Sequence, residues 1–274
     1  MKKLRIYQVD AFASEVFKGN PAAVVPLETW LDDATMQSIA LENNLSETAF
    51  FVREGDGFHI RWFTPVTEVE LCGHATLASG YVVLDLLERG RARVAFASKS
   101  GELVVSVAHP PTGSDDASTE LAMHLPSWPP TPCAAPPKLV EALGIAPREM
   151  LAARDYLAVY DSEAEVRALA PNMSLLATLD RDVIVTAPSG EAGSEKGVDF
   201  VSRFFAPRLG ILEDPVTGSA HCILTPYWAK RLGKTKLRAF QCSSRGGELA
   251  CEARGASVVI AGRATLYMEG TIYV

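Results

Sequence analysis

The stretch of residues 71–90 (LCGHATLASGYVVLDLLERG) constrains the fold most, because it predicts a helix that is apolar on every side. Its apolar residues cover the whole helical wheel, and its first charged residue is Asp85. A helix of this kind is enclosed by other structure. The stretch is too short, and too closely flanked by glycine and serine, to span a membrane. We therefore predict a central buried helix whose N-terminus lies at Gly73 and His74.

The same arrangement occurs twice in the chain. An R-x-F-x-P motif at residues 61–65 precedes the turn at residues 73–75 (GHA) and the first apolar helix. A second R-x-F-x-P motif at residues 203–207 precedes the turn at residues 218–220 (GSA) and another stretch that is apolar all round. The shared order of strand, proline, loop, glycine and apolar helix favours two homologous halves over a chance match of short motifs.

Composition limits the classes of partner. The 274 residues fit one large domain or two medium ones, and the repeat favours two. The net charge is −7 and no basic cluster is present, so we expect neither nucleic acid nor an acidic membrane surface as a partner. The five cysteines are odd in number and lack CxxC spacing, and the N-terminal segment enters an alternating strand without an apolar signal core. We expect a reduced, cytoplasmic protein.

A change in amino-acid composition near the middle of the chain predicts the domain boundary. Residues 109–119 are rich in Pro, Gly, Ser and Asp, and residues 126–137 are dominated by proline. We place the junction here, with an N-terminal domain of residues 1–118 and a C-terminal domain of residues 119–274. The last strand is able to pack back on the first domain.

Strands outnumber helices in the predicted order of elements. They come in runs rather than in strict alternation with helices, which is typical of an α+β fold. We expect a mixed sheet curled around one helix in each half. Near the C-terminus, the pattern predicts two separate strands, at residues 258–261 and 264–274.

Two helix N-termini, Gly73-His74 and Gly218-Ser219, are the first candidates for a binding site. The first N–H groups of a helix have no partner within it, and the helix dipole favours a bound carboxylate there. Glycine lets a ligand approach the backbone closely. If the halves face each other, both ends converge on one cleft. The alternative is that each glycine only permits a strand-to-helix turn, and the duplication favours a site.

Two carboxylates are candidates for chemistry. Glu47 begins an apolar strand, where a carboxyl group partly removed from water suits general acid–base catalysis. The alternative is that Glu47 is a solvent-exposed charge at the edge of a strand, as a single glutamate more commonly is. Asp214 precedes the second apolar helix, where it could serve simply as a cap. No HExxH or paired Cys/His spacing predicts a metal site, and the isolated Cys72-Gly73-His74 run is weak evidence for one.

Several segments together resemble the PhzF family, the phenazine-biosynthesis isomerase group within the diaminopimelate-epimerase-like superfamily. The segments that carry this resemblance are Val9–Phe12, Gly19–Val24, Ser46–Phe50, Phe63–Pro65, Cys72–Thr76 and Glu213–Ala220. They occur in the family's order over essentially the whole chain. The resemblance implies two pseudo-symmetric domains, each a β-barrel-like roll around a central buried helix, with the site in the cleft.

The resemblance also implies roles for individual residues. The glutamate of the family's S-E-T motif is the acid/base, a role that carries over to Glu47. The G-H and D-P-V-T-G-S elements line the pocket. The resulting catalytic candidates are Glu47, His74 and Asp214, and the substrate-binding candidates are Asn20, Gly73, Gly218 and Ser219. The resemblance implies neither a cofactor nor a metal.

The sequence thus predicts a cofactor-independent isomerase that moves a proton on a small carboxylate-bearing metabolite, and we expect a homodimer. One alternative is a non-catalytic binding protein that keeps the fold. A second is a racemase or epimerase. Epimerases of this fold use two facing cysteines, one at the start of each central helix. Here Cys72 matches the first, but the second half has no thiol near Pro215 and Val216, which disfavours that chemistry.

Overall fold

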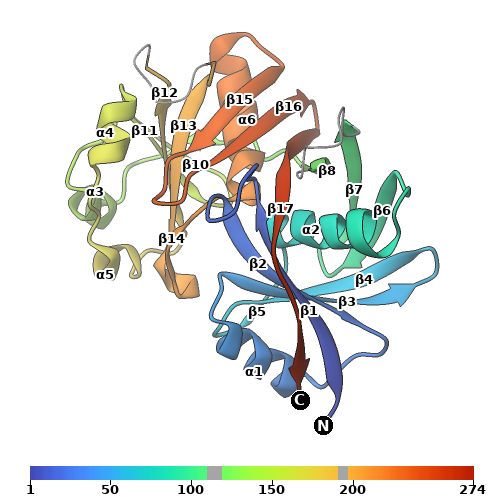
Figure 1. Cartoon of the computed structure of the whole chain (residues 1–274). Coiled ribbons are helices and arrows are strands. Elements are labelled where there is room, and N and C mark those ends of the chain that lie inside the picture. Colours follow the sequence, from blue (N-terminus) through green and yellow to red (C-terminus); the bar gives the residue numbers. More distant parts are fainter. Residues whose placement is uncertain (110–118, 191–196) are drawn as a thin grey trace. The chain divides into compact units, whose positions relative to one another are not determined.

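The computed structural model describes residues 1–109, 119–190 and 197–274 (Figure 1). The chain forms two compact units. Unit 1 comprises Met1–His124 and Ala261–Val274, and unit 2 comprises Leu125–Ile260. The boundary expected between residues 118 and 119 lies at the end of the stretch 110–118, which is outside the described residues. None of the described helices is long and apolar enough to cross a membrane.

Unit 1 is a mixed barrel built around one helix. Its strands are β1 (Lys3–Ala11), β2 (Asn20–Leu27), β3 (Glu47–Glu54), β4 (Gly57–Phe63), β5 (Glu68–Val69), β6 (Arg93–Ser98), β7 (Gly101–His109), β8 (Thr119–Pro126) and the C-terminal β17 (Ser257–Tyr273). Helix α1 (Asp33–Asn43) joins β2 to β3, and α2 (Gly73–Tyr81), continued by a π-helical turn (Val82–Leu87), joins β5 to β6. β2 is parallel to β3, and β4 to β6. The pairing of β17 with both β1 and β8 closes a ring of eight strands.

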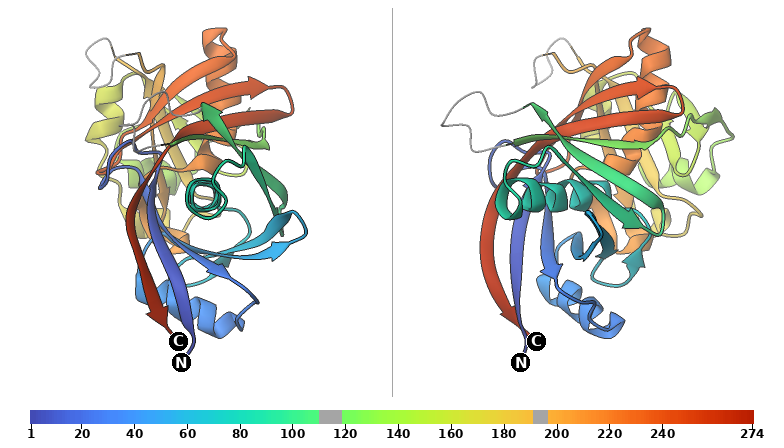
Figure 2. Two further views of the ribbon diagram at one scale, coloured as in Figure 1. Left: turned by 45° about the vertical axis from the view of Figure 1, so that its right-hand side comes forward. Right: turned by 90° about the vertical axis from the view of Figure 1, so that its right-hand side faces the viewer.

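The predicted central helix is confirmed. Every residue of α2 is buried, and Figure 2 (left) looks along this helix with the strands of unit 1 around it. Small residues let the strands approach closely, since a Cβ added to Gly80 would lie 2.5 Å from Cγ1 of Val105 on β7. The hydroxyl of Ser79 donates to the carbonyl of Ala75, so this polar group is satisfied inside the barrel.

The strands of unit 2 pair in the same order as those of unit 1. Its strands are β9 (Thr131–Pro132), β10 (Glu149–Ala152), β11 (Tyr156–Val159), β12 (Val183–Pro188), β13 (Phe200–Ala206), β14 (Ile211–Asp214), β15 (Lys236–Gln241) and β16 (Gly247–Arg254). Its helices are α3 (Pro137–Leu143), α4 (Glu163–Ala168), α5 (Met173–Leu176), a 3-10 turn (Pro207–Leu209) and α6 (Gly218–Leu232). β11 is parallel to β12, and β13 to β15, as β2 is to β3 and β4 to β6. α6 follows β14 as α2 follows β5, which confirms the predicted duplication.

The R-x-F-x-P motifs are duplicated in their contacts as well as in sequence. In unit 1, Nε and Nη2 of Arg61 donate to the two carboxylate oxygens of Glu68, at 2.8 and 2.9 Å. In unit 2, the same two atoms of Arg203 donate to Glu213 at 2.8 and 2.9 Å. Each guanidinium also lies over the phenylalanine of its own motif, at 5.2 and 4.9 Å from the ring centroid. The motif therefore fixes the strand pair that leads into each central helix.

The C-terminal segment differs from the prediction of two strands. It forms the single strand β17, whose residues from Ala264 onward pair antiparallel with β1. Gly262 does not have a positive φ, so the chain runs straight through the residue at which a break was expected. The register of this ladder shifts between Gln8 and Val9 of β1, which pair with Met268 and Leu266, so Tyr267 of β17 is the extra residue of a β-bulge.

Candidate active site

Unit 1 brings together Asn20, Glu47 and His74, three of the predicted site residues. Asn20 is the first residue of β2 and Glu47 the first of β3. Because these strands are parallel, with Ala22 opposite Glu47, both residues lie at the same edge of the barrel. His74 is the second residue of α2, after Gly73. All three side chains are buried, with residue exposures of 0%, 8% and 3%.

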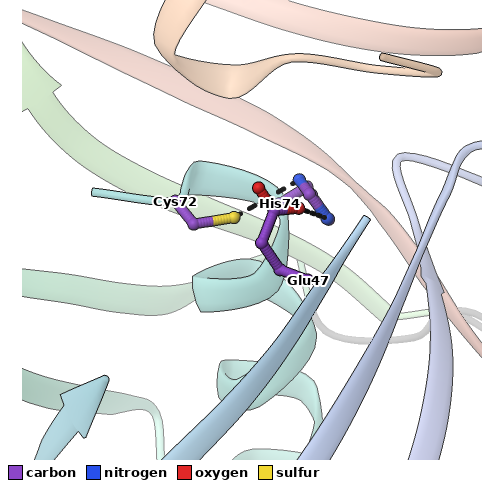
Figure 3. Close-up of side chains that lie close together, drawn as sticks. All are labelled: Glu47, Cys72 and His74. Atoms are coloured by element: carbon purple, nitrogen blue, oxygen red, sulfur yellow. Dashed lines mark hydrogen bonds and ion pairs between the residues drawn. The ribbon is translucent and has the colours of Figure 1, made fainter. Parts of the chain in front are cut away.

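His74 is the centre of this cluster (Figure 3). Its Nδ1 lies 3.1 Å from Nδ2 of Asn20 and 3.5 Å from Sγ of Cys72. Its Nε2 lies 3.2 Å from Oε2 of Glu47. The amide nitrogen and the thiol both carry protons, so Nδ1 acts as the acceptor. The ring proton therefore resides on Nε2, the ring nitrogen beside Glu47.

His74 is neutral at physiological pH. Burial lowers the pKa of its imidazole from the ordinary value of 6.5 to about 3, because the charged ring would lose its hydration. The contact with Glu47 is therefore one between a neutral ring and a carboxyl group, and not a pair of opposite charges. A neutral ring at this distance adds no positive charge to the site.

The N-terminus of α2 adds a second source of polarity. Gly73 and His74 are its first two residues, and their N–H groups belong to the helix turn that has no intrahelical acceptor. Together with the helix dipole, these groups favour negative charge at this end of the barrel. The position next to Glu47 is therefore suited to a carboxylate-bearing ligand.

In unit 2, the predicted residues Asp214, Gly218 and Ser219 lie at the start of α6. Asp214 ends β14 and is buried, whereas Gly218 and Ser219 open the helix. The carboxylate of Asp214 accepts a hydrogen bond from the hydroxyl of Thr217, which is the N-cap residue of α6. Asp214 is thus not itself the cap, contrary to the simpler explanation offered by the sequence.

Gln241 holds this segment in place. Its Oε1 accepts from the backbone N–H of Thr217 at 2.9 Å, and its Nε2 donates to the backbone carbonyl of Asp214 at 2.7 Å. Gln241 is not recognisable from the sequence, because a glutamine at the end of a strand carries no motif. Thr217, by contrast, lies within the D-P-V-T-G-S segment, although it was not singled out there.

The two central helices differ at the residue that caps each N-terminus. Cys72 occupies this position in α2 and Thr217 occupies it in α6. The second position was expected near Pro215 and Val216, and the structure places it at Thr217. A hydroxyl therefore stands where a two-thiol epimerase would need its second cysteine.

The repeat also identifies a counterpart of Glu47 in unit 2. Thr48 pairs with Phe63, and Val183 pairs with Phe205, the phenylalanines of the two R-x-F-x-P motifs. Glu47 directly precedes Thr48, and Asp182 directly precedes Val183. Asp182 therefore corresponds to Glu47. Asp182 is not recognisable from the sequence, because its correspondence with Glu47 depends on strand register.

Asp155 lies beside Asp182. β11 is parallel to β12 with Tyr156 opposite Val183, and each aspartate lies one residue earlier. Burial, together with the negative charge of Asp182, raises the pKa of Asp155 from 3.8 to about 7, although three nearby arginines oppose the shift. Burial also raises the pKa of Asp182. The pair therefore retains a proton in the folded protein under conditions in which an exposed aspartate is ionised.

This raised pKa predicts that Asp155→Asn stabilises the protein at alkaline pH. Between about pH 4 and pH 7 the folded chain holds a proton on Asp155 that the unfolded chain has released, so wild-type stability falls as the pH rises through this window. Asparagine cannot ionise, so the variant avoids that loss. We expect a gain in unfolding free energy of roughly 1–3 kcal/mol at pH 8, and little gain at pH 4. Denaturant titrations at both pH values measure this difference, and an equal effect at both would contradict it.

Comparison with known proteins places the chain in a family. Residues 9–270 match the family described as phenazine biosynthesis-like protein, PhzC-PhzF. An uncharacterised isomerase of Pseudomonas aeruginosa is 52% identical over 273 residues, with 99% of each chain covered. The crystal structure of a PhzF family protein from Enterococcus faecalis has a TM-score of 0.89 and 45% identity, and the match covers 100% of both chains.

A more distant likeness concerns the fold alone. The structure of a hydroxyproline epimerase from Agrobacterium vitis has a TM-score of 0.63 at 10% identity, and the match covers 98% of this chain and 92% of the other. The expected epimerase-like α+β architecture is thereby confirmed. With the whole-length family match and the relatives that are named isomerases, the chain is an isomerase-type enzyme of the PhzC-PhzF family of phenazine biosynthesis-like proteins.

Proposed function

We propose that this enzyme moves a proton on a small carboxylate-bearing metabolite without a cofactor, and that Glu47 is the general acid/base. The observation that carries the proposal is the contact of 3.2 Å between Oε2 of Glu47 and Nε2 of a neutral His74, beside the N-terminus of α2. A positioned carboxylate in a buried site is a common solution for proton transfer between carbon atoms.

The contacts suggest a division of labour between Glu47 and His74. The carboxylate of Glu47 takes a proton from a carbon of the substrate and returns it to another atom on the same face. The neutral ring of His74 lies against this carboxylate and keeps one of its oxygens in a fixed place. Because His74 stays neutral, it does not depress the basicity of Glu47 as an imidazolium would.

We propose that the helix N-termini bind the polar groups of the substrate. Gly73 and His74 provide backbone N–H groups for its carboxylate, which requires no compensating cation. The same role is proposed for Gly218 and Ser219 at the start of α6. Asp214, fixed by Thr217, is proposed to orient a hydroxyl or amino group of the substrate or to assist the transfer.

Solvent-hydrogen exchange tests this proposal directly. Small cyclic and amino carboxylates are incubated with the enzyme in D₂O, and isomers and deuterium content are followed by NMR and mass spectrometry. We expect double-bond migration or proton relocation, with either one deuterium incorporated or the original hydrogen returned when the site excludes water. Cofactor-dependent turnover, or turnover that does not require Glu47, would contradict the proposal.

Asn20→Asp is expected to reduce turnover at least about tenfold, because it places a group that cannot donate a proton next to Nδ1 of His74. An aspartate there accepts from Nδ1–H and so favours the tautomer that leaves Nε2 without a proton. A wrong histidine tautomer is known to be costly in a catalytic triad. Nitrogen NMR of the His74 ring and kcat are the measurements. Asn172→Asp, at the cap of α5, is the control, because aspartate caps a helix as well as asparagine does.

Cys72→Ala distinguishes proton transfer by Glu47 from epimerase chemistry. We expect the variant to keep most of its turnover and to lose about 1–2 kcal/mol of stability from lost packing. A catalytic thiol would instead be essential, and alkylation would inactivate the enzyme. An inactive variant, together with inversion of a stereocentre in the wild-type reaction, would show that Cys72 carries the proton.

A further inference from the structure

Cys72, His74 and Glu47 form a set of metal-binding donors that their proposed roles in isomerisation do not require. They offer a thiol sulfur, an imidazole nitrogen and a carboxylate oxygen, and these donor atoms lie within 4.8 Å of one another. Figure 3 shows the three side chains directed toward a common point at the start of α2. All three are buried, so water competes weakly for an ion held among them.

The separation of Cys72 and His74 matches a tetrahedral zinc ion. With Zn–S of about 2.3 Å and Zn–N of about 2.0–2.1 Å, tetrahedral geometry places sulfur and nitrogen about 3.5–3.6 Å apart. The observed distance between Sγ of Cys72 and Nδ1 of His74 is 3.5 Å. An ion between them takes the Nδ1 lone pair from Asn20, whose amide turns away. The carboxylate of Glu47, which now has Oε2 3.2 Å from Nε2, completes the set of donors when its side chain rotates toward the ion.

The mixture of donors favours one class of ion. Thiolate and imidazole together select Zn²⁺ over Mg²⁺ or Ca²⁺, which prefer oxygen ligands alone. The imidazole of His74 offers the Nδ1 lone pair that Asn20 and Cys72 now face. As the Zn–S bond forms, the thiol proton of Cys72 leaves to solvent. Thiolate and carboxylate then balance the two charges of the ion at the positive end of the helix dipole.

We propose that Cys72, His74 and Glu47 bind Zn²⁺ and that the bound ion reversibly inhibits the enzyme. The ion occupies the carboxylate of Glu47, so the base is withdrawn from proton transfer. Binding follows from the geometry of the three donors alone. Its effect on turnover rests on the proposed function, because it requires Glu47 to be the base.

Binding is tested without substrate. The reduced full-length protein, stripped of metal, is titrated with Co²⁺ as a spectroscopic probe and then with Zn²⁺ in competition. We expect one ion per chain, a tetrahedral spectrum with thiolate charge-transfer absorption, and displacement by Zn²⁺. Cys72→Ser should remove the charge-transfer band and weaken Zn²⁺ binding at least about tenfold. Glu47→Gln, which keeps the shape of the side chain, should also weaken binding.

Cys133→Ala provides the matched control. Cys133 is the most accessible of the five cysteines, so it is the thiol that would bind a metal nonspecifically. Its variant should bind Co²⁺ as the wild type does. Thermal unfolding verifies that Cys72→Ser is folded. A charge-transfer band that persists in folded Cys72→Ser, or that disappears in Cys133→Ala, would overturn the site.

Inhibition is measured separately from binding. Stoichiometric Zn²⁺ should suppress isomerisation by the wild-type enzyme, and a chelator should restore it. Zinc that binds at these residues and leaves turnover unchanged would overturn the inhibitory role. The proposed function is judged independently, because metal-free Glu47→Gln either loses turnover or retains it.

Discussion

Glu47→Gln is expected to lower turnover by about 10²–10⁴-fold while the fold stays intact, because a positioned acid/base contributes about this much to a reaction rate. The amide has nearly the shape of the carboxylate, and its oxygen can take the same place beside Nε2 of His74. It cannot take up a proton from carbon at neutral pH. Ligand binding should therefore change much less than kcat.

The measurement is kcat and KM on a substrate found by the exchange screen, with deuterium incorporation as a second readout. Asp182→Asn is the matched control, because it removes the carboxyl group at the corresponding position of the second barrel. We expect this control to retain its turnover. Wild-type kcat in Glu47→Gln would remove Glu47 from the mechanism, and loss of activity in both variants would indicate that the two positions do not differ in function as proposed.

Arg203→Ala is expected to have the largest effect on stability, lowering the free energy of unfolding by about 2–4 kcal/mol. Arg203 makes a two-pronged contact with Glu213, and its Nη1 also donates to the carbonyls of Val166 and Leu169 at 3.1 and 2.7 Å. Only 13% of its side chain is exposed. Its removal leaves a carboxylate and two carbonyls without their donor in a place that water reaches poorly.

Denaturant unfolding measures this effect. Arg254→Ala is the control, because Arg254 forms a single contact with Glu252 and half of its side chain is exposed. We expect the midpoint of that control to stay at the wild-type value, as surface pairs contribute little. A double-mutant cycle of Arg203→Ala and Glu213→Ala should show strong coupling. Equal effects of Arg203→Ala and Arg254→Ala would contradict the structural role of the repeated motif.

The sequence by itself determined the helix at the centre of each barrel. A run that is apolar all round can be stable only when it is enclosed, and this holds whatever encloses it. The duplication could also be recognised from the sequence, because the two R-x-F-x-P motifs share residue types as well as spacing. Glu47 and His74 were found as candidates because their motifs match a family, and the position of each at the start of an element was readable from local pattern.

Only the tertiary structure decided how these residues combine. The contact of Asn20 with His74 joins positions 54 residues apart, and no local pattern carries that information. The counterpart of Glu47 at Asp182, with Asp155 beside it, follows from strand register, in which a shift of one residue would turn both side chains to the other face. Gln241 reaches the start of α6 through pairing of β13 with β15. The single strand β17 persists through Gly262 because it pairs with β8 as well as with β1, whose ladder begins at Ala264, so long-range pairing outweighed the local tendency of glycine to interrupt a strand.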